Sequence, residues 1–115
     1  MDVTVVSKAS DLVVQIRDCL AQGVYPLVDM KIRGQDLSNI KNIFSILRKS
    51  FAPVEVIACM SAIHSEMYSK KFLNQLHREV DYVCFTHTDL CMNWVSMMNI
   101  HLQFIQIPIA YMTTG

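Results

Sequence analysis

Apolar segments rich in β-branched residues alternate with amphipathic segments along this chain, and no other feature limits the fold more. At the start, a β-branched run is followed by Ser10 and Asp11, which suit a helix N-terminus, and then by apolar residues at helical spacing. The segments that favour strands are residues 3–6, 25–32, 53–59, 82–85 and 104–109. Amphipathic segments between them favour helices, so the predicted order is β-α-β-α-β-α-β-α-β. Gly23 should end the first helix, and Asp36 should cap the second, whose apolar residues Ile40, Phe44 and Leu47 recur at helical spacing. The third helix should turn Met67, Leu73 and Leu76 inward, and the fourth, capped by Thr88, should turn Trp94, Val95 and Met98 inward.

This order predicts an α/β fold. Strands separated by helices pair in parallel, and right-handed crossovers place those helices over the sheet. We therefore expect a mostly parallel sheet of about five strands with helices on both faces. Because 115 residues is an ordinary size for one folding unit, we expect residues 1–115 to form a single domain.

The composition excludes some classes of protein. Apolar residues make up 52% of the chain and charged residues 17%, which is not the composition of a disordered segment, and no apolar run is long enough to cross a bilayer. Ten basic residues balance ten acidic ones, so any binding to nucleic acid must be local rather than driven by a global positive field. The four cysteines show no CxxC spacing, which indicates free thiols in a reducing compartment.

Motifs for cofactor chemistry and catalysis are missing from the sequence. The three glycines form neither a dinucleotide-binding nor a triphosphate-binding loop, which disfavours a nucleotide-dependent enzyme. Cys84, His87 and Cys91, with His101 further on, have poor spacing for zinc, and core thiols beside a surface histidine explain them better. Cys59 and His64 form a weak nucleophile pair, because no orienting group accompanies them. We expect no enzyme activity, no metal and no cofactor.

Short turns with hydroxyl side chains follow several predicted strands. They are Ser7–Ser10, Thr86–Thr88 and Thr113–Gly115, with Met60–Ser61 after a further strand. All lie at carboxyl strand ends, so we expect them to line one rim of the sheet and to present helix N-termini to an anion such as a phosphate backbone. Ordinary helix capping explains each turn separately and remains the alternative.

Positive charge near this rim would come from Lys8, Lys31 and Arg33. A second basic group, Lys70, Lys71 and Arg78, is also explained by a solvated helix face. Asp29 lies inside an apolar segment, so we expect it either to bond a neighbouring loop or to belong to a site.

The C-terminal sequence resembles a viral family. I-P-I-A-Y-M-T-T-G at residues 107–115 resembles M-P-I-G-Y-V-T-H-G of the middle macrodomain of the coronavirus SARS-unique domain, part of the replicase subunit that carries the papain-like protease. Residues 4–7 resemble the family's T-V-S, residues 28–31 its M-D-V-R, and residues 80–82 its V-D-Y, in the same order. Residues 42–79 show no matching motif.

The resemblance implies a three-layer α/β/α macrodomain-like sandwich that has lost ADP-ribose chemistry and binds RNA instead. The implied RNA is single-stranded and A-rich, or G-rich and quadruplex-forming. The implied partners are other domains of the same polyprotein and host proteins. The implied place is the host cytoplasm, at replication membranes reached through the parent protein, with no membrane insertion by this domain. In that family another helix and strand follow the T-x-G loop, which in this sequence is formed by its last residues, 113–115.

We therefore predict a non-catalytic RNA-binding module of a coronavirus replicase protein that supports viral replication and transcription. The predicted RNA-binding residues are Lys8, Ser10, Lys31, Arg33, Thr88, Tyr111 and Thr113. Tyr25 is an alternative to Tyr111 for stacking on a base. A protein-docking module would instead expose apolar surface around Trp94, Met97 and Met98. A residual ADP-ribose binder would need a pocket at residues 113–115.

Overall fold

The computed structural model describes residues 4–6, 8–30, 37–51, 53–90 and 94–114. The chain divides into two compact units, Met1–Pro53 and Val54–Gly115, and each is described by itself. The coarse expectation of an α/β fold is confirmed, with four helices and a three-stranded parallel sheet among the described residues. The single-domain expectation stays a prediction.

In the first unit, helix α1 spans Ala9–Ala21. Its N-cap is Lys8, which has extended backbone angles and whose carbonyl accepts a hydrogen bond from Leu12 N at 3.1 Å. The prediction that Ser10 caps this helix is wrong, because the chain turns into the helix before Ser10 and leaves that side chain in the first turn. Gly23 ends the helix as expected, at φ +72°, a backbone angle that glycine adopts without strain.

Helix α2 spans Leu37–Ser50 and is clearly amphipathic. Ile40, Phe44 and Leu47 recur at helical spacing and are buried, as predicted. Arg48 and Lys49 lie in the last turn, where the helix dipole favours positive charge. The expected cap of this helix, Asp36, lies outside the described residues.

The structure differs from the expectation for the two segments predicted to be the first strands. Residues 4–6 and 24–30 have no regular secondary structure, so the described sheet has three strands rather than about five. Val5 is 93% exposed and Leu27 is 81% exposed. β-Branched residues favour an extended backbone, but a strand also needs a partner to complete its hydrogen-bond ladder. Asp29 is exposed, and therefore needs no buried partner.

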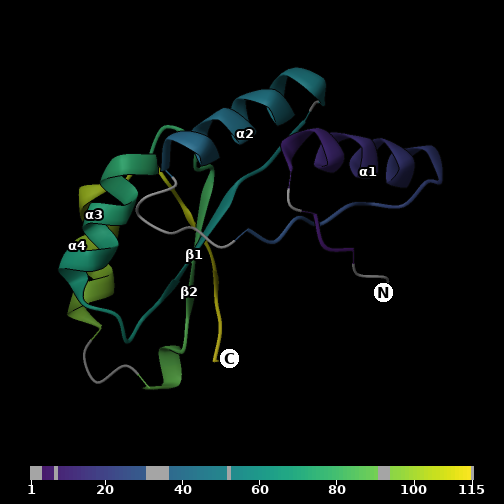
Figure 1. The fold of residues 1–115 in the computed structure, drawn as a ribbon. Coiled ribbons are helices and arrows are strands. Elements are labelled where there is room, and N and C mark those ends of the chain that lie inside the picture. Colours follow the sequence, from purple (N-terminus) through teal and green to yellow (C-terminus); the bar gives the residue numbers. More distant parts are fainter. Residues whose placement is uncertain (1–3, 7, 31–36, 52, 91–93, 115) are drawn as a thin grey trace. The chain divides into compact units, whose positions relative to one another are not determined.

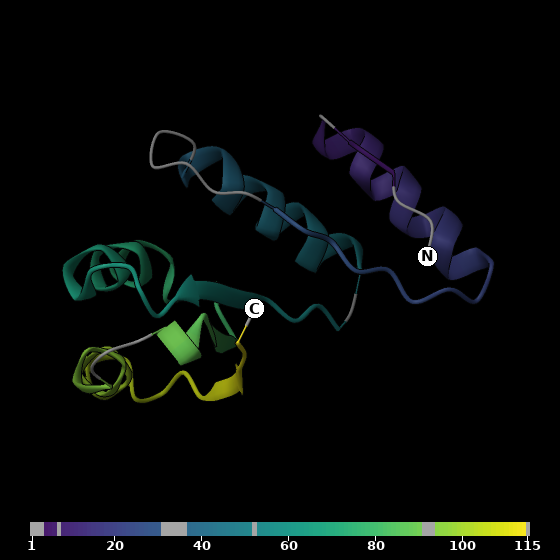
Figure 2. The same ribbon diagram turned by 90° about the horizontal axis from the view of Figure 1, so that it is seen from below.

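The second unit is a β-α-β-α-β arrangement. Its elements are β1 (Ile57–Ser61), α3 (Glu66–Leu76), β2 (Tyr82–Thr86), the 3₁₀ helix η2 (Thr88–Leu90), α4 (Val95–Gln103) and β3 (Ile109–Met112). The strands pair in parallel in the order β1-β2-β3, and Cys59 of β1 lies opposite Cys84 of β2. Right-handed crossovers that advance in one direction place their helices on one face of the sheet. Helices α3 and α4 lie side by side on such a face (Figures 1 and 2).

The core of this unit lies between these two helices and the sheet. Leu73 and Leu76 of α3 and Phe85 of β2 are at most 1% exposed. A polar contact also joins the helices, because Asn99 Nδ2 donates to Glu66 Oε1 at 3.1 Å, and Lys70 Nζ lies 3.0 Å from the other oxygen of Glu66. Hydrogen bonds from Lys70 and then from Asn99 lower the pKa of Glu66.

Helices α3 and α4 turn other residues toward the core than the sequence predicts. Met67 is predicted to face the core, but it is 80% exposed, while Ser69 is buried beside Leu73. In α4, Met97 and Ile100 face inward, whereas Trp94 and Met98 are about half exposed, contrary to the prediction. Apolar residues lie on both sides of α4, so their spacing alone does not say which side meets the sheet.

Strand β3 also begins later than predicted. Phe104 and Ile105 belong to the turn after α4, and the paired strand starts at Ile109. Its pairing with β2 contains a bulge: Val83 lies opposite Ile109, but the next residue, Cys84, lies opposite Tyr111. One extra residue, Ala110, is therefore accommodated in β3.

Candidate functional site

The carboxyl ends of the three parallel strands meet at one edge of the second unit's sheet. Hydroxyl side chains gather there, together with one imidazole, and we call this group the hydroxyl rim: Ser61, Thr86, His87, Thr88 and Thr113. The prediction that turns after these strands share a rim is confirmed for the second unit. In open α/β sheets, ligands bind at such carboxyl ends.

Backbone hydrogen bonds hold the rim together. The peptide N–H of Thr88 and its hydroxyl both donate to the Thr113 carbonyl, each at 3.0 Å, and Thr113 N donates to Phe85 O at 2.8 Å. On the other side, Ala62 N donates to Thr86 O at 2.8 Å. These donors join neighbouring strand ends to each other, so they position the rim rather than face an anion.

The expectation that Thr88 caps an α-helix is therefore wrong. Thr88 is only 9% exposed and heads a three-residue 3₁₀ turn, while Trp94 occupies the N-cap position of α4 without a side-chain capping bond. Its hydroxyl is bonded to a carbonyl 25 positions later in the chain, and a nonlocal contact of this kind leaves no signal in the local sequence. Its contact with RNA stays a prediction.

His87 is at the centre of the rim and has an unusual backbone. Its φ is +55°, the only positive φ of a non-glycine residue in the described parts of the chain. This left-handed conformation costs on the order of 1–2 kcal/mol for a residue with a Cβ, and such strain is concentrated at functional sites. In the sequence, His87 stands out only as a weak zinc candidate. Its position in Thr86-His87-Thr88, directly after a buried strand, is the one signal that points to this turn.

The imidazole of His87 is fixed by two hydroxyls. Nδ1 lies 3.2 Å from Ser61 Oγ and 3.0 Å from Thr86 Oγ1, and Ile63 N donates to Ser61 Oγ at 3.4 Å. Each hydroxyl can donate to Nδ1 or accept from it, so these contacts fit both neutral tautomers. In the tautomer with its proton on Nε2, the hydroxyls donate to Nδ1 and the Nε2–H group can donate to another acceptor.

Ser61 and His87 resemble a catalytic pair only in composition. A nucleophilic serine also needs backbone donors for the oxyanion. The nearest such groups are already used, because Ala62 N is bonded to Thr86 O and His64 N to Ser61 O. These two backbone N–H groups are therefore not free to stabilise an oxyanion.

Exposed aromatic rings occur on β3 and at the start of α3, which follows β1 in the chain. Tyr111 of β3, two residues before Thr113, is 61% exposed. After β1, His64 and Tyr68 form an edge-to-face pair with ring centroids 5.2 Å apart, and Tyr68 is 57% exposed. Ser65 caps α3, because its hydroxyl accepts a hydrogen bond from Tyr68 N at 3.1 Å, and this bond fixes the start of the helix that carries Tyr68. Neither the His64–Tyr68 pair nor this cap is among the sequence predictions.

The structure brings together three of the predicted RNA-binding residues. Thr88, Tyr111 and Thr113 all lie at or next to the rim. Lys8 and Ser10 are exposed at the start of α1, in the first unit. The remaining two, Lys31 and Arg33, lie outside the described residues.

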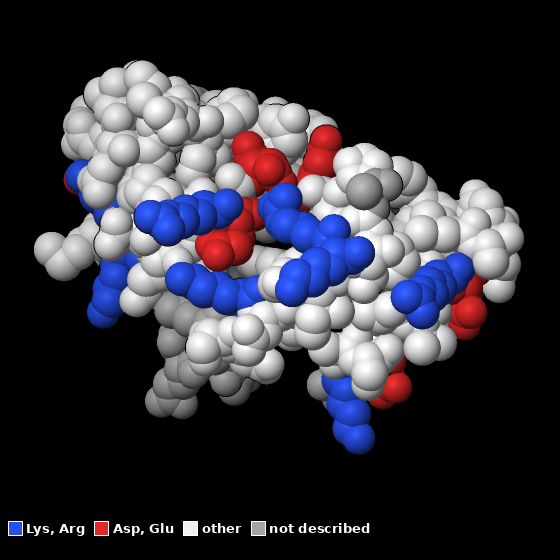
Figure 3. All heavy atoms as spheres, turned by 90° about the horizontal axis from the view of Figure 1, so that it is seen from above, with Lys and Arg blue, Asp and Glu red and all other residues white. Residues whose placement is uncertain are grey.

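Basic side chains are not concentrated at the rim itself. Figure 3 shows exposed side chains of both signs, Lys and Arg as well as Asp and Glu. In the second unit, Lys70 is paired with Glu66. In the first unit, α2 carries exposed Lys41 and Lys49 together with Arg48, and no acidic residue occurs between Leu37 and Ser50.

The described cysteines are free and do not form a metal centre. No group of three or more His, Cys, Asp or Glu side chains in the described residues is arranged to hold a metal ion. Cys84 is buried and Cys59, opposite it in the sheet, is exposed. Burial, followed by the nearby Cys59 thiol, raises the pKa of Cys84. Cys91, another of the zinc ligand candidates considered from the sequence, lies outside the described residues.

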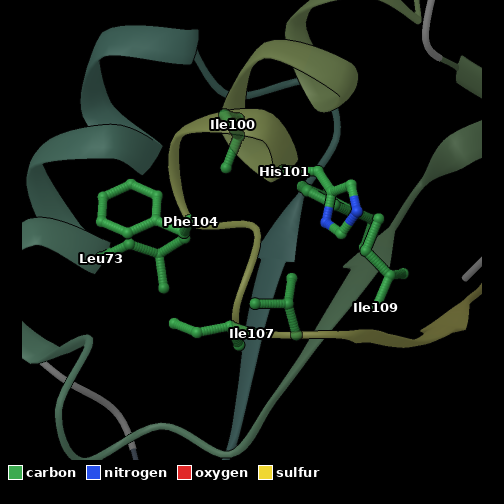
Figure 4. A pocket seen from close by; sticks show the side chains of 8 residues that line it. Leu73, Ile100, His101, Phe104, Ile107 and Ile109 are labelled. Carbon is green, nitrogen blue, oxygen red and sulfur yellow. The ribbon is translucent and has the colours of Figure 1, made fainter.

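Two hollows in the structure differ in place and size. A cavity of about 10 Å³ lies between the helices and the sheet of the second unit, with the His101 ring at its wall (Figure 4). It has room for at most one water molecule, and His101 Nδ1 is buried without a hydrogen-bond partner. A shallow hollow of about 260 Å³ lies at Thr4–Val6 and the side of α1. Neither hollow includes Thr113, so neither supports an ADP-ribose pocket there.

Comparisons with protein-family models, with curated proteins and with solved structures find no match for this chain. In the part of the chain that the structure describes, no helix combines the length and the hydropathy that crossing a bilayer requires.

Proposed function

We propose that this chain is a non-catalytic module that binds single-stranded RNA, with the hydroxyl rim as the contact surface. The observation that carries the proposal is the strained, doubly hydrogen-bonded His87 at the carboxyl ends of three parallel strands, next to exposed aromatic rings. Binding sites of open α/β sheets lie at this edge, and residues with a strained backbone are concentrated at functional sites.

The exposed rings supply a surface for bases. Single-stranded nucleic acid is bound through stacking on aromatic side chains, which is worth about 1–3 kcal/mol per base. Tyr111 and the His64–Tyr68 pair offer such rings on two elements that end or begin at the rim. An unpaired base exposes its hydrogen-bonding edge, and the Nε2–H of His87 is suited to an acceptor on that edge or on a phosphate.

Phosphate contacts would come from exposed basic side chains. In the second unit, Lys71 and Arg78 are exposed. Contacts from Lys8, Lys31 and Arg33, which belong to the first unit, stay predictions. Because the chain has a net charge of zero, the affinity should depend only weakly on salt, with release of a few counterions.

The resemblance of the C-terminal segment to the SARS-unique macrodomain supplies the biological context of the proposal. In that context the module belongs to a coronavirus replicase polyprotein in the host cytoplasm, where it supports replication and transcription beside other domains of the same protein. The finer fold that this context implies is a three-layer macrodomain-like sandwich.

The RNA proposal is tested by fluorescence anisotropy with labelled oligo(A), oligo(G) and mixed RNA at two salt concentrations. Tyr111→Ala should weaken binding about 5- to 100-fold, the equivalent of one lost stacking contact. Tyr111→Phe is the matched control, because it keeps the exposed ring and removes only the hydroxyl, so it should bind RNA like the unchanged protein. ADP-ribose should not compete. If Tyr111→Ala binds as tightly as the unchanged protein, or if ADP-ribose displaces the RNA, the proposed site is wrong.

The second candidate function is protein docking. The observation in its favour is the apolar surface of α4, where Trp94 and Met98 are exposed as that hypothesis requires, although Met97 is buried and does not take part.

A further inference from the structure

Helix α4 has two apolar faces. Met97 and Ile100 point into the core and are at most 4% exposed. On the outer side, apolar residues continue from the N-cap of α4 to the turn after the helix and are each 52–63% exposed. We call this set the α4 stripe; it comprises Trp94, Val95, Met98, Leu102 and Ile105. Single exposed apolar residues are normal on a protein surface, but a continuous stripe of large ones marks an interaction surface.

The α4 stripe lies in a part of the chain without formal charge. No Asp, Glu, Lys or Arg occurs from Leu90 to Gly115. The stripe therefore offers no charge that would orient it toward an acidic or basic partner. An uncharged apolar helix face is complementary to a second copy of itself, because a two-fold axis places the same surface on both sides of the interface.

The size of the stripe is sufficient for a weak dimer. A large apolar side chain at this exposure presents on the order of 100 Å², so the stripe presents roughly 500–600 Å². Two copies would bury about 1,000–1,200 Å², which is at the lower limit of specific protein interfaces. Such an interface fits reversible association better than a permanent dimer.

We propose that the α4 stripe is the interface of a homodimer, with the α4 helices of two copies packed antiparallel about a two-fold axis. Met98 and Leu102 are nearest the middle of the stripe and meet across the axis, while Trp94 of one copy packs near Ile105 of the other. A dissociation constant on the order of 1–100 µM is expected for this area. The proposal does not depend on the RNA-binding function.

Sedimentation equilibrium of the full chain between about 1 and 200 µM tests the interface. Met98→Glu should leave the protein monomeric throughout, because two carboxylates would face the apolar interface. Met67→Glu is the matched control: Met67 is also an exposed methionine, on α3 and outside the stripe, and this variant should dimerise like the unchanged protein. Trp94 is the single tryptophan of the chain, so its emission should shift to shorter wavelength as the concentration rises.

A mixing experiment checks the antiparallel arrangement. Met98→Glu and Leu102→Lys should each be monomeric alone, but an equimolar mixture should form heterodimers, because the new carboxylate and ammonium groups meet across the axis. Circular dichroism should show equal folding for all variants, since both positions are exposed. A monomeric unchanged protein at 200 µM would overturn the proposal, as would dimers that Met98→Glu leaves intact or that Met67→Glu abolishes.

Discussion

At position 87, a glycine variant should be more stable than an alanine variant, which is the reverse of the usual order. Both variants lose the hydrogen bonds to Ser61 and Thr86, which share one ring nitrogen and are worth about 1 kcal/mol together. They differ in the backbone. At φ +55° the alanine Cβ costs about 1–2 kcal/mol, whereas glycine adopts this angle freely. Alanine recovers about 0.4–1 kcal/mol by restricting the unfolded chain. His87→Gly should therefore be more stable than His87→Ala by about 0.5–1 kcal/mol.

Urea denaturation followed by circular dichroism measures this difference. With a denaturant dependence of roughly 1.5 kcal/mol per molar urea, the two midpoints should lie about 0.3–0.7 M apart. At an ordinary negative φ the order is opposite, because alanine is then the more stable residue by about 0.4–1 kcal/mol. An alanine variant that unfolds at the higher urea concentration would thus refute the strained turn, and with it the main support for the rim as a site.

Three further predictions concern the second unit. Leu73→Ala, at a side chain with 0% exposure beside the small cavity, should cost about 3–5 kcal/mol of unfolding free energy and lower the melting temperature, whereas the exposed Leu102→Ala should change it by less than about 0.5 kcal/mol. Cys59 should react with an aromatic disulfide reagent in the folded protein and Cys84 only after unfolding, because Cys84 is buried and its thiol pKa is raised; equal rates would contradict the packing of β2. The pKa of Glu66 is lowered in the folded state. Its contribution to stability is therefore present above the ordinary pKa of 4.5 and is lost as the pH falls through the lower pKa of the folded state. Glu66→Gln should flatten the pH dependence of the urea midpoint in that acid range.

The sequence is informative where the signal is local. The apolar spacing of α2 predicts its buried residues Ile40, Phe44 and Leu47, and Gly23 predicts the end of α1. The alternation of elements predicts a parallel sheet and a shared rim at its carboxyl ends. These features depend on residues within one or two turns of each other, or on a general rule of chain connection.

The failures involve contacts between distant residues. Thr88 has the sequence context of a helix cap, but its hydroxyl bonds Thr113, and α4 starts at Val95 instead. The outward position of Met98 is also set by packing, because α4 is apolar on both sides and its spacing does not say which side is buried. His87 has the sequence context of an ordinary surface histidine, because a backbone angle that a turn imposes is not written in the side-chain pattern. The predicted strands before residue 33 show the same limit, since β propensity does not say whether a partner strand is present.

The bulge in β3 decides which side of the sheet the ring of Tyr111 occupies. Successive residues of a strand point to opposite faces, and a regular ladder would place Ala110 opposite Cys84 and Tyr111 opposite Phe85, on the side of the helices and the core. Because the bulge accommodates Ala110, Tyr111 lies opposite Cys84 instead, and its ring is exposed. Pairing register thus determines the exposure of this ring as much as residue identity does. A one-residue change in strand pairing, with no substitution, is a route by which such a module could gain or lose a stacking surface.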